Sequence, residues 1–306
     1  MKLDFSDIKV LLIGDFMIDH YIIGTSTRMS PEAPVPVVIP EKEYSIPGGA
    51  GNVAMNLSSM GANVTCLGAV GNDISGQKLI EILNTNNIST KYIEFIKGYT
   101  TTLKKRIYSN GIQIARVDQE EYLDWNPNIS ENFDYEDYDV IILSDYSKGV
   151  LMRPWFFKPK GTNVILDPKN KKWEHLLKHS NIVTPNLNEL EKLSGVNIID
   201  NNSILNACNK LIEENNFDYI IAKKGDQGIS VVGKDNFVKH IEAHHVDNAD
   251  VTGAGDTVIA TLSLAYAKNK DIEFSAKLAN AAAAIVVGKT GTATASIKEI
   301  REFPIK

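Results

Sequence analysis

Residues 250–257, with the sequence DVTGAGDT, combine small side chains with aspartates directly before an apolar stretch. Gly253, Ala254 and Gly255 would let an anion approach the backbone N–H groups at the start of a helix, where the helix dipole favours negative charge. Asp256 would repel a phosphate, but it can act as a general base that takes a proton from a hydroxyl group. The pattern therefore indicates either a phosphoryl-transfer site or an ordinary capped helix with Asp256 in its first turn.

A second glycine-rich segment, PGGAGNVA, also precedes a predicted helix. Gly48, Gly49 and Asn52 could contact a polyhydroxylated ligand through their backbone and the amide. The segment also matches the G-x-G-x-x-A pattern of nicotinamide-dependent oxidoreductases, which requires a strand directly before the glycines. The preceding EKEYSIP predicts a poor strand, so a sugar-binding loop is favoured. Glycines that serve only tight packing are the remaining alternative.

Polar side chains follow a predicted strand in TPNLNELE, residues 184–191. The carboxyl ends of strands are where open α/β sheets bind ligands. Asn186 and Glu189 could hold magnesium through water, because this ion keeps much of its hydration shell. The same two residues could instead form a capping box at the start of a helix.

Cationic side chains gather in residues 101–118, TTLKKRIYSNGIQIARVD, whose alternation around an Asn-Gly step is typical of a β-hairpin. Lys104 and Arg106 share one strand face because they are two residues apart, and Arg116 lies on the other strand with Asp118. Cations on a hairpin can bind a substrate phosphate, and arginine does so with two hydrogen bonds. A solvated strand face is the alternative.

The elements that position these residues follow from the alternation of short β-branched runs with helical patterns. This rhythm predicts an α/β fold with a mainly parallel central sheet flanked by helices. Two segments, about 20–45 and 90–118, break the rhythm and predict a small β-strand lid, with one strand at 35–39. No linker divides the chain, so we expect a single domain over 1–306. The predicted strands are 9–13, 63–67, 139–143, 163–166, 181–184, 219–222 and 229–232, and the predicted helices are 50–60, 74–84, 188–194, 203–214, 255–268 and 272–287.

Composition restricts the classes of ligand. The 306 residues include 32 basic and 38 acidic side chains, for a net charge of −6, so no overall field attracts nucleic acid or an anionic membrane. An anionic ligand must therefore be bound by local groups. The two cysteines form no CxxC pair, and the N-terminal residues do not resemble a signal peptide, so we expect a cytoplasmic protein.

Taken together, these segments resemble the PfkB/ribokinase family of carbohydrate kinases over nearly the whole chain. The two family signatures are GGAGN and DVTGAGDT. Other strings resemble the branch of the family that phosphorylates D-glycero-β-D-manno-heptose 7-phosphate: GDFMIDHY, RMSPEAPVPVV, LSDYSKGV, LDPKN and LANAAAAIVVGKTGTA. The resemblance implies a ribokinase-like fold and in-line transfer of the ATP γ-phosphoryl group, with Mg²⁺, to the anomeric hydroxyl of the heptose. The product would be the 1,7-bisphosphate of ADP-heptose and lipopolysaccharide core synthesis.

The resemblance also implies roles for individual residues. The catalytic base would be Asp256, and the anion hole would be formed by Gly253, Ala254 and Gly255. The sugar hydroxyls would contact Asp19, Gly48, Gly49 and Asn52. The 7-phosphate would be bound by Lys104 and Arg106, with Arg116 and Lys148 nearby. ATP and magnesium would lie beside Asn186, Leu187, Asn188 and Glu189, with Glu189 holding the metal through water, and the nucleotide would be bordered by Gly225, Gly228 and Asn280.

The sequence departs from the family pattern in two places. Residues 149–166 are fewer than the family normally has, and Pro154 and Pro159 disfavour a crossover helix there. The segment Ala222-Lys223-Lys224-Gly225 lacks the Thr or Ser commonly found beside the nucleotide. In many relatives an adenylyltransferase domain follows the kinase domain, and we expect only the kinase part in this chain. We also expect a homodimer, with the exposed lid as its contact surface, and a small sugar phosphate as the binding partner.

Overall fold

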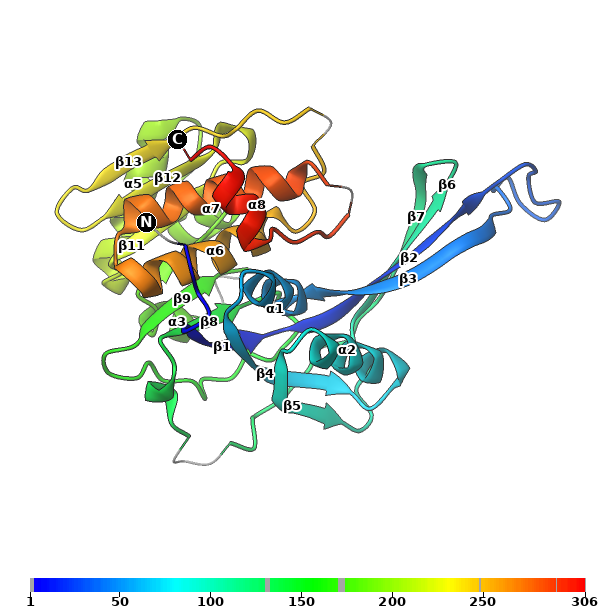
Figure 1. Ribbon diagram of the computed structural model, residues 1–306, viewed down its shortest axis with the longest axis horizontal. Helices are drawn as coiled ribbons and strands as arrows, with labels where there is room; N and C mark the ends of the chain where they lie inside the picture. Colours follow the sequence, from blue (N-terminus) through cyan, green and yellow to red (C-terminus); the bar gives the residue numbers. More distant parts are fainter. Residues whose placement is uncertain (1–2, 130–132, 170–173, 248, 290, 306) are drawn as a thin grey trace.

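A nine-stranded sheet runs through the protein, in the order β13-β12-β11-β10-β9-β8-β1-β4-β5 (Figure 1). The computed structural model describes residues 3–129, 133–169, 174–247, 249–289 and 291–305. Neighbouring strands from β5 to β11 are parallel, whereas β12 and β13 pair antiparallel. The strands are β1 (Lys9–Gly14), β4 (Asn63–Gly71), β5 (Ser89–Ile96), β8 (Val140–Ser144), β9 (Asn163–Asp167), β10 (Ile182–Val183), β11 (Tyr219–Lys223), β12 (Ile229–Gly233) and β13 (Val238–Ile241). The mainly parallel sheet predicted from the sequence is confirmed.

Helices cover both faces of this sheet and create two apolar cores. In β1, Val10 and Leu12 belong to one core and Leu11 and Ile13 to the other, as the two-residue period of a strand requires. The first face is covered by α1 (Ala50–Ser59), α2 (Ile74–Thr85), α6 (Ala254–Asn269), α7 (Ile272–Val287) and α8 (Ile297–Glu302). The second is covered by α3 (Glu174–Lys178), α4 (Leu187–Ser194) and α5 (Asn201–Asn215). In the described ranges, no helix is long and apolar enough to span a membrane.

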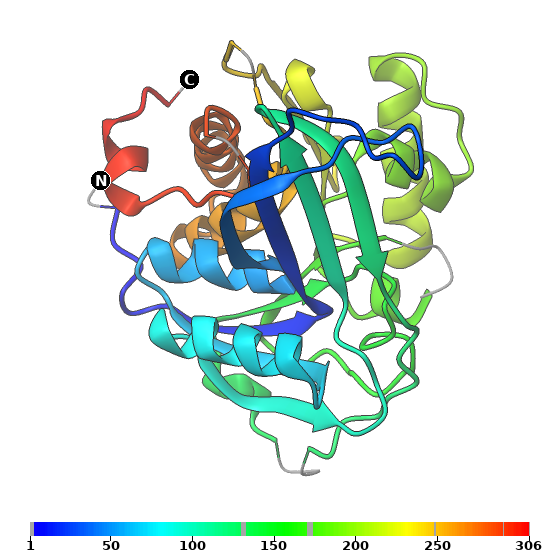
Figure 2. The same cartoon turned by 90° about the vertical axis from the view of Figure 1, so that its right-hand side faces the viewer.

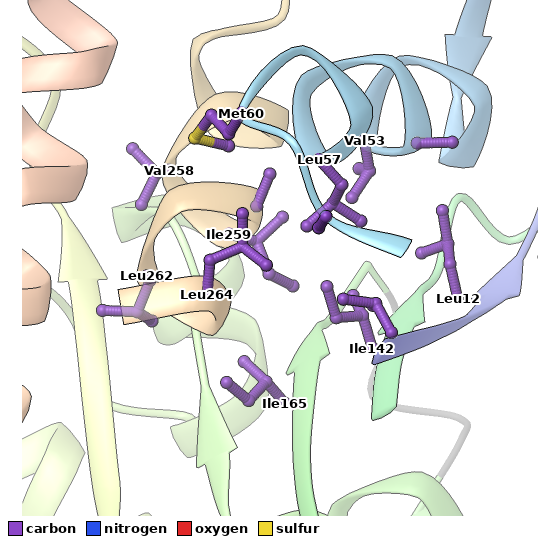
Figure 3. Packing of buried hydrophobic residues seen from close by; sticks show 14 of the residues in the cluster. Leu12, Val53, Leu57, Met60, Ile142, Ile165, Val258, Ile259, Leu262 and Leu264 are labelled. Carbon is purple, nitrogen blue, oxygen red and sulfur yellow. The ribbon is translucent and has the colours of Figure 1, made fainter. Parts of the chain in front are cut away.

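The first core fixes the two helices that begin at the glycine-rich segments. Figure 3 shows Leu57 of α1 and Ile259 of α6 gathered with Leu12 and Ile142 of the sheet. All four side chains are fully buried. The N-termini of α1 and α6 are therefore held in a fixed position relative to the sheet.

The carboxyl ends of the parallel strands lie at one edge of the sheet. Gly14 of β1 is opposite Ser144 of β8, and Ser144 is opposite Asp167 of β9. Ligands of open α/β sheets bind outside this edge. Residues that end these strands, or directly follow them, are consequently placed together.

A second, four-stranded sheet projects from the body and is named the small sheet here (Figures 1 and 2). It has the order β3-β2-β6-β7 and consists of β2 (Phe16–Thr25), β3 (Ile39–Gly49), β6 (Leu103–Ser109) and β7 (Ile112–Gln119). Asp15 alone separates β1 from β2, so the small sheet begins at the edge where ligands bind. Asn110 and Gly111 join β6 to β7 with φ of 52° and 81°, which confirms the predicted hairpin turn.

Three expectations about this region are wrong. Residues 41–47 form most of β3, because an edge strand needs backbone partners on one side only and tolerates charged residues and proline. The predicted strand at 35–39 is absent: Pro36 forms one isolated bridge with Met29, and Ile39 opens β3. Residues 89–96 are β5 of the large sheet, so the second small-sheet segment begins at Leu103 and not near residue 90.

Two further expectations concern connections. Gly48 and Gly49 end a strand and Gly51 lies in α1, but β3 belongs to the small sheet, so these glycines do not lie in the βαβ unit that a dinucleotide fingerprint requires. Residues 145–162, all described, contain no helix between β8 and β9, as Pro154 and Pro159 predicted.

Candidate active site

Asp256 lies in the first turn of α6 and is 6% exposed. The Asn52 amide donates a hydrogen bond to its Oδ2 at 2.7 Å, and the Tyr146 hydroxyl donates to its Oδ1. Burial raises the pKa of Asp256 to about 6, although these two hydrogen bonds act in the opposite direction. The carboxylate is therefore ionised at neutral pH, yet basic enough to accept a proton from a bound hydroxyl.

The loop before Asp256 needs glycine for two reasons. Gly253 has a φ of 78°, and a Cβ atom at this residue would lie 2.7 Å from Nδ2 of Asn52. Gly253 is also the N-cap residue of α6, and no described side chain caps this helix. The Ala254 N–H, expected to form part of the anion hole, donates to the backbone oxygen of Val251 at 3.2 Å, which leaves the N–H groups of Gly255 and Asp256 for an anion.

A cleft of about 180 Å³ opens beside Asp256 at the carboxyl edge of the sheet. Its charged lining consists of four carboxylates and two lysines: Asp145, Asp167, Glu189, Asp256, Lys169 and Lys223. Lys223 pairs with Asp167 at 2.6 Å, and Lys169 pairs with Glu189 at 3.0 Å.

The donor set of this cleft fits a nucleotide that carries a divalent cation. Carboxylate oxygens are the ligands that magnesium prefers, and the first-turn N–H groups of α6 and the two lysines match phosphate oxygens. Within the described part of the chain, no group of three or more His, Cys, Asp or Glu side chains is arranged to hold a metal ion. A magnesium ion bound here would therefore depend on water and phosphate oxygens as well.

Asn186 and Glu189 form a capping box at the start of α4, which was one of the two interpretations of their spacing. The Asn186 backbone donates to Oε2 of Glu189 at 2.8 Å, and the Glu189 backbone donates to Oδ1 of Asn186 at 2.9 Å. Both residues also line the cleft, so capping and ligand contact are compatible. The Leu187 side chain packs against the second core and Asn188 is exposed, which leaves mainly backbone groups of these two for a ligand.

The residues expected to bind sugar hydroxyls lie on β2, at the end of β3 and in the first turn of α1. Asp19 of β2 is buried and forms an ion pair with Arg106 of β6 at 2.7 Å. A Cβ atom on Gly48 would lie 2.7 Å from Oδ2 of Asp19. The Thr292 hydroxyl donates to the same oxygen at 3.4 Å. A Cβ atom on Gly253 would lie 3.3 Å from the Thr292 methyl group, so Asp19 is close to the anion loop.

Gly49 has a structural role at the junction of β3 and α1. It is the N-cap residue of α1 with a φ of 56°, and a Cβ atom there would lie 2.7 Å from the backbone oxygen of Asp15. The close approach of the two backbones thus requires glycine.

The four expected phosphate-binding cations do not share one environment. Lys104 lies over the ring of Tyr146 at 5.9 Å, and among the described residues no carboxylate is within ion-pair distance of it. Arg106 is engaged by Asp19, and Lys148 pairs with Glu120 at 2.5 Å. Arg116 is exposed and pairs with Asp118 of its own strand at 2.9 Å. Of the four, Lys104 has the environment best suited to an incoming phosphate.

The remaining nucleotide candidates are not among the residues that line this cleft. Gly225 and Gly228 lie in the loop between β11 and β12 with positive φ, and a Cβ on Gly228 would lie 2.1 Å from the backbone oxygen of Ile241. Asn280 of α7 donates to the backbone oxygen of Glu242 at 2.8 Å. Gly228 and Asn280 therefore border the segment that follows β13, whereas a Cβ on Gly225 would have no neighbour within 4 Å.

The polar residues of the site that were not assigned a role from the residue patterns include Asp15, Tyr146, Asp167 and Lys223. Asp15 is buried and accepts hydrogen bonds from three backbone N–H groups within residues 146–150, so it fixes the loop that carries Tyr146. Each of the four ends a strand or closely follows one at the carboxyl edge. That rule, applied to every predicted strand, could have found them.

The fold is similar to those of solved ribokinases. Ribokinase from Arabidopsis thaliana complexed with ribose and ATP superposes with a TM-score of 0.77 at 18% identity, covering 96% of this chain and 98% of that one. Ribokinase from Thermotoga maritima gives a TM-score of 0.73 at 22% identity, covering 96% and 98%. The architecture is thus ribokinase-like, and a buried aspartate beside free helix-start N–H groups is an arrangement suited to phosphoryl transfer.

The family is defined by sequence. A model described as pfkB family carbohydrate kinase matches residues 7–299. The chain belongs to this family of carbohydrate kinases, which confirms the resemblance and agrees with the use of ATP.

The chain is 37% identical to the Bifunctional protein HldE of Sulfurimonas denitrificans over 309 residues, covering 96% of this chain and 64% of that protein. The corresponding protein of Helicobacter pylori (strain J99) is 39% identical over 304 residues, covering 95% and 65%. The chain thus spans about two thirds of the length of these relatives.

The environment of Asp256 predicts a pH dependence of turnover. If Asp256 is the general base, it must be ionised, so kcat/KM should fall as pH decreases through about 6. Tyr146→Phe removes a hydrogen bond that favours the ionised form, so the acidic limb should move to higher pH. Initial rates measured over roughly pH 5 to 9 test both the acidic limb and its shift in the variant.

The matched control is Tyr266→Phe, which changes the same residue type at the opposite end of α6. It should leave the acidic limb where the unmodified enzyme has it. An unchanged limb in Tyr146→Phe would contradict the assigned effect of the Tyr146 hydroxyl on Asp256.

Proposed function

We propose that this protein transfers the γ-phosphoryl group of ATP to the anomeric hydroxyl of D-glycero-β-D-manno-heptose 7-phosphate. The strings RMSPEAPVPVV and GKTGTA, which resemble the heptose branch of the family, support this substrate. The HldE relatives support it as well. The proposal covers the kinase reaction only, and its product is the 1,7-bisphosphate used for ADP-heptose and the lipopolysaccharide core.

In the proposed mechanism, Asp256 takes the proton of the anomeric hydroxyl as its oxygen bonds to the γ-phosphorus. The bond between this phosphorus and the β–γ bridging oxygen breaks, and ADP leaves with the electron pair. The N–H groups of Gly255 and Asp256 stabilise negative charge on the transferred group. Asp19, held in place by Arg106, orients the sugar through its hydroxyls. Magnesium, held by Glu189 through water, would neutralise phosphate charge.

The position of Lys104 is the observation that carries the choice of a phosphorylated acceptor. One tyrosine ring separates its ammonium group from the Asp256 carboxylate, because Tyr146 contacts both. A sugar whose reacting hydroxyl lies at Asp256 could therefore place a distant phosphate at Lys104. Burial lowers the pKa of Lys104, and an incoming phosphate would favour its charged form.

An ADP-release assay over a panel of acceptors tests the proposal. The panel contains ribose, fructose, fructose 6-phosphate and the heptose 7-phosphate. We expect the highest kcat/KM for the heptose 7-phosphate. Efficient phosphorylation of ribose or fructose, with no turnover of the heptose phosphate, would overturn the substrate and point to another sugar kinase of the family.

A substitution at Lys104 tests the phosphate contact itself. Lys104→Gln should raise KM for the phosphorylated acceptor by about 10- to 100-fold, with a smaller change in kcat, because a hydrogen bond to a charged group is lost. Lys105→Gln is the matched control: Lys105 is exposed and lines a separate hollow with Ile18 and His20. Equal KM values in the two variants would refute the role of Lys104.

We also propose that the protein is a cytoplasmic homodimer. Its two cysteines, Cys66 and Cys208, are buried and unpaired, which suits a reducing compartment.

The small sheet supplies the surface for the dimer contact. It projects from the body, and its edge strand β7 exposes Ile112, Ile114 and Val117. Such a surface suits contact with a second copy. Sedimentation equilibrium at micromolar concentration should give twice the chain mass, and a monomer mass would contradict the proposal.

A further inference from the structure

The ion pair between Lys223 and Asp167 stands in the wall of the active-site cleft. Nζ of Lys223 lies 2.6 Å from Oδ1 of Asp167, and each side chain is 14% exposed. The Thr184 hydroxyl donates to the same oxygen at 2.8 Å. Asp167 would therefore keep a hydrogen bond if the lysine moved away. Because removing two charges from water is costly, such a pair is weak evidence for a purely stabilising role.

Lys223 also lies beside the anion loop. A Cβ atom on Gly255 would lie 3.4 Å from Nζ of Lys223, and Lys223 and Asp256 line the same cleft. Burial opposes the charge on Lys223, but the carboxylates of Asp167, Glu189 and Asp256 raise its pKa above the ordinary value, so it is charged at neutral pH. A permanent cation thus lies next to the N–H groups that face a transferred phosphoryl group.

We propose that Lys223 exchanges Asp167 for a nonbridging oxygen of the γ-phosphoryl group when ATP binds. Its long, flexible stem allows the ammonium group to change partner while Thr184 continues to hold Asp167. The lysine then stabilises the charge on the phosphoryl group during its transfer from the β–γ bridging oxygen to the acceptor hydroxyl, whose proton passes to Asp256. This inference rests on the ATP-dependent transfer proposed above. The inference also gives a function to residues 222–225, which lack the Thr or Ser commonly found beside the nucleotide in this family.

The test uses Lys223→Gln, with Lys224→Gln as the control at the neighbouring lysine. We expect Lys223→Gln to lower kcat by about 100-fold, the effect of losing one donor to developing charge. Binding is measured by calorimetry with magnesium and either ADP or its γ-phosphate-bearing analogue AMP-PNP. Affinity for AMP-PNP should fall by about tenfold or more and affinity for ADP by less than about threefold, because only AMP-PNP carries the contacted phosphate. Lys224→Gln should change neither.

Removing Lys223 leaves Asp167 without its cationic partner. A second comparison therefore separates the structural effect of the unpaired carboxylate from the catalytic effect of losing the lysine. The double variant Asp167→Asn/Lys223→Gln carries no uncompensated charge and is compared with Asp167→Asn alone. A catalytic lysine predicts that the double variant is slower by about 100-fold. Equal rates in these two variants, or unchanged AMP-PNP affinity in Lys223→Gln, would overturn the proposal. The calorimetry needs no acceptor, so a wrong sugar would leave this test intact.

Discussion

Asp256→Asn should fold and bind ATP but lose about 10³- to 10⁴-fold in kcat, the range expected when a general base is removed. Asparagine has nearly the same shape, and its amide oxygen can accept the hydrogen bond from Asn52 as the carboxylate does. Its amide nitrogen can donate to the Tyr146 hydroxyl, which is able to accept. The lost function is therefore proton acceptance. Steady-state rates, calorimetric ATP binding and thermal unfolding measure the three effects separately.

The control for this variant is Asp271→Asn at the start of α7. The Asp271 side chain caps that helix by accepting from the N–H of Phe274, and asparagine is an equally good cap. Turnover and stability should both stay near those of the unmodified protein. If Asp256→Asn retained turnover within about tenfold, the base assignment would be wrong.

Gly253→Ala should lower kcat by about 100- to 1000-fold, as expected when an anion hole is distorted. An alanine at a φ of 78° is strained, and its Cβ would lie 2.7 Å from the Asn52 amide. Asn52 must then move, and it takes with it the hydrogen bond to Asp256. The variant should therefore lose catalytic rate through both the loop and the base.

Gly61→Ala separates the clash from the backbone strain. Gly61 also has a positive φ, 95°, but a Cβ atom there would have no neighbour within 4 Å. Both variants should lose some stability in chemical denaturation, and only Gly253→Ala should lose turnover. A normal kcat in Gly253→Ala would show that the anion loop tolerates a side chain and would remove the steric argument.

The sequence by itself determined the local features of this protein. The two glycine-rich segments begin α1 and α6, and the Asn110-Gly111 turn joins β6 and β7. Apolar runs identified most strands of the large sheet, because strands buried on both faces are almost entirely apolar. These features depend on residues close together in the chain, which is why periodicity and turn chemistry reveal them. The strand β3 was not identified because its residues 39–43 are exposed, so burial imposes no alternation of apolar and polar side chains there.

Tertiary structure alone decided which of these groups meet. Asn52 and Asp256 are hydrogen-bonded although 204 positions separate them, and no periodicity links them. The sequence also did not reveal the partners of the candidate cations. Arg106 forms an ion pair with Asp19, whereas no described carboxylate lies within ion-pair distance of Lys104. Lys223 acquires its place beside the anion loop because parallel strands bring their carboxyl ends to one edge. Strand order and register set these contacts, and both arise from packing of the whole chain.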